Sequence, residues 1–182
     1  MANMLSPLAT PAATRDVLEE HGLSTKHALG QNFLVNDAIL QKIVELAQLD
    51  ASDDVLEVGP GIGTLTIALL KCAGRVVSVE RDADLPAVLE DTLVLDFFQK
   101  FSQLESATVM VQKEVADRMC AEPGSKNYGA YTVKLRLYAE PAGRFLVSPS
   151  NFFPPPHVDS SVLRLDRRPV CDADGAPLDD AL

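Results

Sequence analysis

The chain has 182 residues, 47% of them apolar and 23% charged, which is typical of a globular protein and excludes a fibrous or wholly disordered one. A net charge of -10 weighs against binding nucleic acid unless the basic residues gather on one face. Three scattered cysteines predict neither a disulfide framework nor a zinc knuckle, and no apolar run approaches the length of a membrane span, so we expect a soluble cytoplasmic protein without a metal.

The first part of the chain predicts alternating helices and strands after a loose tail over residues 1–14. The predicted elements, in the order helix, strand, helix, strand, are residues 36–49, 54–58, 63–74 and 75–80. Asn36 or Asp37 is expected to cap the first helix, and Gly74 to close the second. The strand over residues 54–58 is short and apolar, and we expect it to be buried.

The second part of the chain continues the alternation and ends in two strands. Helices are predicted over residues 82–93, 94–104 and 113–121, and a strand over 107–112. Antiparallel strands over 144–149 and 160–168 flank the loop SNFFPPPHVD. Together the pattern predicts an α/β domain with a largely parallel sheet and helices on its faces.

Three glycines spaced two apart lie between the first predicted strand and the following helix. Gly59, Gly61 and Gly63 lack the Cβ atoms that would prevent a ligand from approaching the backbone, and a helix start offers free N–H groups. Glu57 precedes them by two residues. Glu80 ends the next strand, about where an acid accepts hydrogen bonds from both hydroxyls of a ribose.

The spacing of these glycines differs from the dinucleotide fingerprint G-x-G-x-x-G. The pattern E-x-G-x-G-x-G with an acid after the second strand is typical of class I methyltransferases, and it favours S-adenosylmethionine over NAD. The alternative is a glycine-rich turn that only permits tight packing of helix on strand. Because a sulfonium already activates its methyl group, catalysis of methyl transfer is largely alignment of the acceptor in a site sheltered from water.

Four stretches, in order, resemble the KsgA-type ribosomal RNA adenine dimethyltransferases: KHALGQNFLVND at 26–37, LEVGPGIGTLT at 56–66, VMVQKEVADRM at 109–119 and SPSNFFPPPHVDSSVLRL at 148–165. The resemblance covers most of residues 24–168. It implies a Rossmann-like class I methyltransferase domain and a cytoplasmic, ribosome-assembly enzyme. Such an enzyme uses S-adenosylmethionine to place two methyls on the exocyclic amine of each of two adjacent adenines in small-subunit ribosomal RNA.

The same resemblance implies roles for individual residues of the donor site. Asn32 and Leu34 would lie against the methionine and sulfonium end of the donor, Gly59 and Gly61 beneath it, and Glu80 on its ribose. The alternative for GQNFL is a capped turn with its apolar residues in the core. We expect Asn32 to be functional.

On the RNA side, Phe152 matches the aromatic residue that flanks a flipped-out adenine, and Phe153 beside it could stack or pack inward. For either residue, core packing is the competing interpretation. His157 is expected at the surface or near the RNA backbone rather than on a metal. A basic RNA-facing surface, or alternatively a set of solvated helix faces, is expected from eight residues: Lys26, His27, Lys113, Arg118, Lys126, Lys134, Arg136 and Arg144.

The acceptor motif Asn-Leu-Pro-Tyr of these enzymes is absent, so the catalytic residues are unknown. Between Glu80 and Phe97 there is no room for two further strands with their connections. We expect that a segment near 91–94 is either omitted from the sequence or truly deleted, which would leave the central strand without a neighbour on one side.

The expected organisation is therefore a tail and leading helix over 1–23, a methyltransferase domain over 24–168, and a linker over 169–182 toward a missing C-terminal helical domain. The protein is expected to be a monomer. Two other functions stay open: a non-catalytic RNA-binding or assembly factor with the same fold, and a class I methyltransferase with a different substrate.

Overall fold

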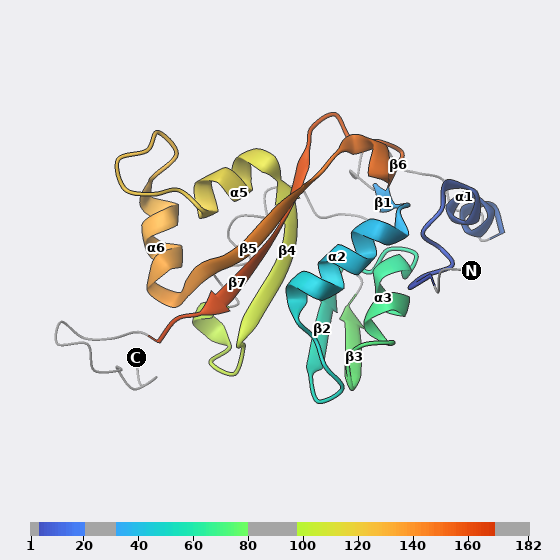
Figure 1. Ribbon diagram of the computed structural model, residues 1–182, viewed down its shortest axis with the longest axis horizontal. Helices are drawn as coiled ribbons and strands as arrows, with labels where there is room; N and C mark the ends of the chain where they lie inside the picture. The colour runs from blue at the N-terminus through green and yellow to red at the C-terminus, as the bar shows by residue number, and fades with distance from the viewer. Residues whose placement is uncertain (1–3, 21–31, 80–97, 170–182) are drawn as a thin grey trace. The chain divides into compact units, whose positions relative to one another are not determined.

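The computed structural model describes residues 4–20, 32–79 and 98–169 (Figure 1). The chain forms two compact units, which are described separately. Unit 1 contains residues 1–87 and 147–159, and unit 2 contains residues 88–146 and 160–182. The helix predicted over 82–93 lies outside the described residues. Of the helix predicted over 94–104, residues 98–100 are helical and 101–104 form a turn instead.

Unit 1 is built on two parallel strands, β2 (Asp54–Val58) and β3 (Arg75–Val79), as the sequence predicted. Helix α3 (Thr64–Leu69) connects them, and α2 (Asp37–Ala47) contacts α3. The pairing is in register from Asp54 opposite Arg75 to Val58 opposite Val79. A parallel pair needs such a helical crossover, so the predicted helix between the strands is confirmed.

Helix α2 begins as predicted. The side chain of Asn36 accepts a hydrogen bond from the backbone N–H of Ala38 at 2.9 Å, which satisfies one of the free donors at the helix start. The helix buries Ile39, Leu40 and Ile43 at helical spacing.

Helix α3 is shorter than predicted, because it ends at Leu69 and not at Gly74. The N–H groups of Lys71 and Cys72 each donate to the carbonyl three residues earlier, the 3-10 pattern that is common where an α-helix ends. Gly74 instead starts the approach to β3. A Cβ atom there would lie 2.3 Å from the carbonyl oxygen of Ala51, so only glycine fits this close crossing of two backbone segments.

The expected tail over residues 1–14 is wrong in its last part, because α1 (Pro11–Glu20) is a helix that begins inside it. Proline suits the first helical position, and Thr10 Oγ1 accepts a hydrogen bond from the N–H of Ala13 at 3.2 Å. Thr14 and Leu18 are the buried residues of this helix.

Two short strands of unit 1 were not predicted. Strand β1 (Phe33–Leu34) pairs antiparallel with β6 (Phe152–Phe153), which follows the 3-10 turn η3 (Pro149–Asn151). The backbone N–H of Val35 extends the pairing by donating to the carbonyl of Asn151 at 2.9 Å. Part of the predicted loop SNFFPPPHVD is therefore an extended, paired segment.

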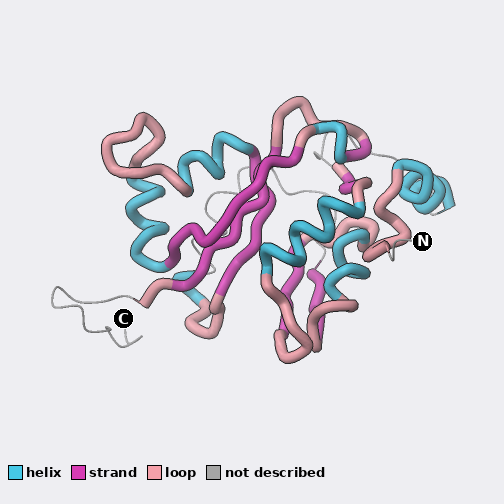
Figure 2. The backbone as a smooth tube through the Cα atoms, in the orientation of Figure 1, coloured by secondary structure: helices cyan, strands magenta, loops and turns pink. Residues whose placement is uncertain are grey.

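Unit 2 contains a three-stranded sheet in the order β4 (Ser106–Gln112), β7 (Ser160–Arg167), β5 (Ala139–Val147), seen as magenta tube in Figure 2. Strands β4 and β7 are antiparallel, with Ser106 opposite Asp166. Helix α5 (Lys113–Met119) follows β4 at once. The unpredicted helix α6 (Ala130–Tyr138) precedes β5, which starts five residues before the predicted strand.

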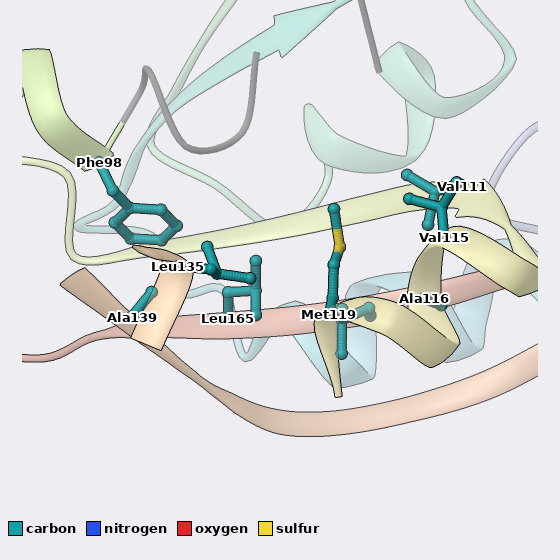
Figure 3. Close-up of a cluster of buried hydrophobic side chains, with 9 residues drawn as sticks. Phe98, Val111, Val115, Ala116, Met119, Leu135, Ala139 and Leu165 are labelled. Carbon is teal, nitrogen blue, oxygen red and sulfur yellow. The ribbon is translucent and has the colours of Figure 1, made fainter. Parts of the chain in front are cut away.

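The core of unit 2 lies between its sheet and helices α5 and α6. Met119 of α5 and Leu135 of α6 are fully buried in one cluster with Leu165 of β7 (Figure 3). The buried cluster comprises Phe98, Val111, Val115, Ala116, Met119, Leu135, Ala139, Leu163 and Leu165. This continuous apolar cluster gives unit 2 its own core.

One face of the β2–β3 pair is exposed, which corrects the prediction that residues 54–58 form a buried strand. The residues that share this face have more than two fifths of their surface accessible: Leu56, Val58, Val77 and Val79. Alternate residues of a strand face opposite sides, and Glu57 on the other side is the one buried residue of β2. Within the described residues, β2 pairs with β3 alone, so its second edge has no strand beside it.

Candidate functional site

The glycine turn, residues 59–63, leaves the carboxyl end of β2 and leads into α3. Gly59, Gly61 and Gly63 have φ angles of 74°, 56° and 84°, in the left-handed region that side chains disfavour. Hydrogen bonds at both ends help to hold the turn: Gly59 N–H donates to Val79 O at 3.0 Å and Gly63 N–H to Pro60 O at 2.9 Å. The spacing of the glycines therefore has a backbone reason, as the sequence indicated.

The space around this turn differs from glycine to glycine. A Cβ atom at Gly59 would meet nothing within 4 Å, whereas one at Gly61 would lie 3.2 Å from the ring of Phe33. The backbone at Gly59 is thus open to a ligand that approaches closely, while Gly61 accommodates an aromatic neighbour. Phe33, an apolar residue of the GQNFL stretch, is half-buried against the turn.

The pairing of β1 with β6 brings the first and last sequence motifs together. Leu34 lies opposite Phe152 and Phe33 opposite Phe153. Asn36 Nδ2 donates to Asn151 Oδ1 at 2.7 Å, which adds a side-chain bond to the backbone ladder. Leu34 also packs partly against the cluster of Ala9, Leu40 and Ala68. The β1–β6 pair therefore contains both a residue expected at the methyl donor, Leu34, and the two residues expected at the RNA, Phe152 and Phe153.

The two phenylalanines of β6 differ in burial. Phe152 is 8% exposed, and Phe153 is half-buried with the guanidinium of Arg15 lying 5.5 Å from its ring centroid. Such stacking of a cation on an aromatic face orients the ring and leaves a positive charge beside it. Sequence reasoning missed Arg15, because no pattern in α1 relates it to a loop more than a hundred residues away.

Glu57 is a second residue whose role sequence reasoning did not assign. Its side chain is buried, and Oε2 accepts hydrogen bonds from Thr66 Oγ1 and Ser78 Oγ, each at 2.7 Å. The acid before the glycines was visible as part of the motif. Its partners were not, because they come from α3 and β3.

The remaining predicted residues lie outside the described ranges, beside β1 or in the loop after β6. Asn32 is half-buried immediately before β1. Glu80, Lys26 and His27 lie outside the described residues, and His157 is exposed in the loop after β6. In the ranges 4–20, 32–79 and 98–169, no three His, Cys, Asp or Glu residues are grouped to hold a metal, and no helix there could cross a bilayer.

Three of the predicted basic residues of unit 2, Lys113, Arg136 and Arg144, form ion pairs. Asp117 accepts from Lys113 Nζ at 2.7 Å and from Arg144 Nη2 at 2.8 Å, and these bonds lower the pKa of its carboxyl group. Arg136 donates to Glu122 at 2.7 Å. Ion pairing therefore engages part of the predicted basic surface, while Lys126 and Lys134 are exposed.

Comparison with protein families gives a match over nearly the whole chain. The family model for ribosomal RNA adenine dimethylase matches residues 22–97 and 91–175. The ribosomal RNA small subunit methyltransferase A of Shouchella clausii is 40% identical over 212 residues, covering 91% of this chain and 72% of the relative. That of Magnetococcus marinus is 39% identical, with 82% and 69% covered.

Solved structures give the same likeness. A dimethyladenosine transferase from Plasmodium falciparum superposes with a TM-score of 0.69 at 28% identity, over 75% of this chain. The match spans 63% of the length of the Plasmodium chain. The 23S rRNA methyltransferase ErmE gives a TM-score of 0.65 at 26% identity, covering 81% of this chain and 72% of ErmE.

Proposed function

This chain belongs to the ribosomal RNA adenine dimethylase family, whose reaction is S-adenosylmethionine-dependent dimethylation of adenine in ribosomal RNA, and we propose that its substrate is small-subunit ribosomal RNA. The proposed targets are two adjacent adenines, each dimethylated at the exocyclic amine during ribosome biogenesis. The structural likeness confirms the predicted fold class, a Rossmann-like class I methyltransferase.

The observation that carries this proposal is the β1–β6 pairing beside the glycine turn. Leu34, proposed at the sulfonium end of the donor, lies directly opposite Phe152, proposed at the flipped adenine. The ring of Phe33, on the same strand as Leu34, lies against Gly61 of the glycine turn. Methyl transfer requires donor and acceptor held in alignment, and this pairing places the residues proposed for each on adjacent strands.

The residues present fit an adenosyl donor. Open space beside Gly59, at positive φ, suits a ligand that contacts backbone. We propose that Gly59 and Gly61 lie beneath the donor, with Asn32 and Leu34 at its methionine end and Glu80 on its ribose. When bound, the donor supplies a methyl group already activated by the positive sulfur. The chain itself binds, orients and shields it from water.

On the acceptor side, we propose that Phe152 and Phe153 form the aromatic wall for the extruded base. Phe153 is the less buried of the two, and Arg15 over its ring adds a cation suited to a neighbouring phosphate. The proposed setting is a monomer in the cytoplasm that acts without a metal.

We also propose that a segment is missing near 91–94, within a methyltransferase domain over 24–168 that is preceded by residues 1–23 and followed by a linker over 169–182. The family model matches in two pieces that meet at 91–97. The 212-residue alignment with the Shouchella relative is longer than this chain, so the relative has residues without a counterpart here. The open edge of β2 and its exposed apolar face are consistent with a lost neighbour.

One assay tests the function. The protein is incubated with S-adenosylmethionine labelled in its methyl group and with small ribosomal subunits that lack the modification. Label recovered as dimethyladenine supports the proposal. Donor binding without transfer supports the non-catalytic assembly factor, which the absent acceptor motif favours. Transfer only to other substrates would indicate a class I methyltransferase with a different specificity.

A further inference from the structure

Glu57 is a buried acid that no step of the proposed reaction uses. Its side chain is 7% exposed, and within the described part of the chain no Lys, Arg or His side chain pairs with it. Placing a carboxyl group in such a position costs free energy unless hydrogen bonds compensate. The compensation comes from the hydroxyls of Thr66 and Ser78, which both donate to Oε2.

One hydroxyl donor comes from α3, which follows the glycine turn, and the other comes from β3, which pairs with β2. Ser78 lies directly opposite Glu57 in the β2–β3 ladder. Thr66 lies on α3, three residues after Gly63, where the turn becomes a helix. Glu57 itself precedes the turn by two residues. One carboxylate oxygen therefore joins the strand before the turn, the strand beside it and the helix after it.

These two hydrogen bonds are suited to fixing the turn. Both distances from hydroxyl oxygen to Oε2 are 2.7 Å, the usual length of a well-formed O–H···O hydrogen bond. A binding site needs its groups held to within roughly 0.5 Å, and glycines supply no side-chain packing of their own. The stiffness of the turn must therefore come from its neighbours.

We propose that Glu57 is a positioning residue, which holds residues 59–63 in the conformation that binds the methyl donor by tying α3 to β3. This inference rests on the proposed function of the turn as the donor site. It predicts that Glu57 acts through the hydrogen bonds of Oε2 and not through its charge. A residue that keeps a suitable acceptor should therefore preserve donor binding.

The test compares Glu57→Leu, which removes the acceptor, with Glu57→Gln, whose amide oxygen can accept both hydroxyls. Isothermal titration with S-adenosylmethionine should show donor affinity at least about tenfold weaker in Glu57→Leu and within about twofold of wild type in Glu57→Gln. Glu45→Gln, an exposed acid on α2, controls for loss of one charge. Equal affinity in wild type and Glu57→Leu, or an equal loss in both Glu57 variants, would overturn the proposal.

Hydrogen exchange without donor gives an independent reading. The amides of Gly63 and Ile67, which bond to Pro60 and Gly63, should exchange faster in Glu57→Leu. The Cys120 amide, bonded to Ala116 in α5, should not change. Unchanged exchange at the turn would contradict the inference.

Two further variants cover the case in which Glu57→Leu does not fold. Thr66→Val and Ser78→Ala each remove one hydroxyl and retain the acid, and each should weaken donor binding less than loss of the acceptor. Wild-type affinity in both would overturn the proposal. A wild-type protein that binds no donor would refute the proposed function itself, and the exchange rates would still show whether Glu57 orders the turn.

Discussion

At the scale of single residues, two buried threonines show how context decides the value of one hydroxyl. Thr64 begins α3 and is 5% exposed, and its buried Oγ1 has no hydrogen-bond partner among the described residues. Thr132 of α6 is 1% exposed, and its hydroxyl donates to the carbonyl of Arg118 at 2.8 Å. Burying an unpaired hydroxyl costs free energy, whereas a paired one contributes to stability.

The substitution of each threonine by valine should therefore have opposite effects. Thr64→Val is expected to leave the free energy of unfolding unchanged or raise it by up to about 1 kcal/mol, and Thr132→Val to lower it by about 1–2 kcal/mol. Urea unfolding followed by circular dichroism measures both. Equal destabilisation by the two variants would show that Thr64 has a partner after all.

The pairing of Asp117 with Lys113 and Arg144 predicts a pH dependence. Both bonds stabilise the carboxylate and lower the pKa of Asp117 in the folded protein. A lowered folded pKa stabilises the protein above the unfolded value, and the contribution is lost as pH falls through the folded value. Asp117→Asn should thus reduce stability at pH 7 by about 0.5–1 kcal/mol, typical of exposed pairs.

The difference between wild type and Asp117→Asn should shrink as pH falls through the lowered pKa of Asp117, because the wild-type carboxyl group then becomes protonated too. Urea unfolding at pH 7 and at successively lower pH measures it. Glu140→Gln, which removes an exposed acid of β5, serves as the charge control. A difference that stays constant from neutral to acid pH would contradict the ion-pair explanation.

At the scale of elements, Asn36 has two tasks at the start of α2. Its Oδ1 caps the helix through Ala38, and its Nδ2 donates to Asn151 beside β6. Asn36→Ala should lose both and destabilise unit 1 by about 1–2 kcal/mol, while Asn36→Ser should recover the cap alone. Thermal unfolding of the three proteins separates the contributions. If serine restored full stability, the bond to Asn151 would contribute nothing.

The sequence predicted the longer helices and strands better than the shortest strands. The helix over α2 and the strands β2, β3, β4 and β7 were predictable, because apolar spacing and flanking caps are local. Strands β1 and β6 have two residues each, too few for any alternation to appear. Helix α6 was missed because apolar and polar residues alternate from Val133 to Leu137, a spacing typical of a strand, and because Tyr, Thr and Val are weak helix formers.

At the scale of the whole molecule, the proposed missing segment leads to a test by insertion. The residues of the Shouchella relative that have no counterpart here are placed between Asp91 and Val94. Covering Leu56 and Val77 should lower the fluorescence of a dye that binds apolar surface, and adenine methylation should appear or increase. No change in either reading would contradict the proposal. If mass spectrometry of the natural protein gave a mass above that of the 182-residue sequence, the segment would be omitted from the sequence and not deleted from the protein.

What the sequence by itself determined were features encoded in neighbouring residues: the order of α/β elements, the glycine turn, the Asn36 cap and the family. Tertiary structure alone decided which phenylalanine of β6 is buried, which cations are paired, and what Glu57 holds. The physical reason is distance along the chain. Phe33 meets Phe153 and Arg144 meets Asp117 only after the backbone has closed long loops, and no local pattern encodes such contacts.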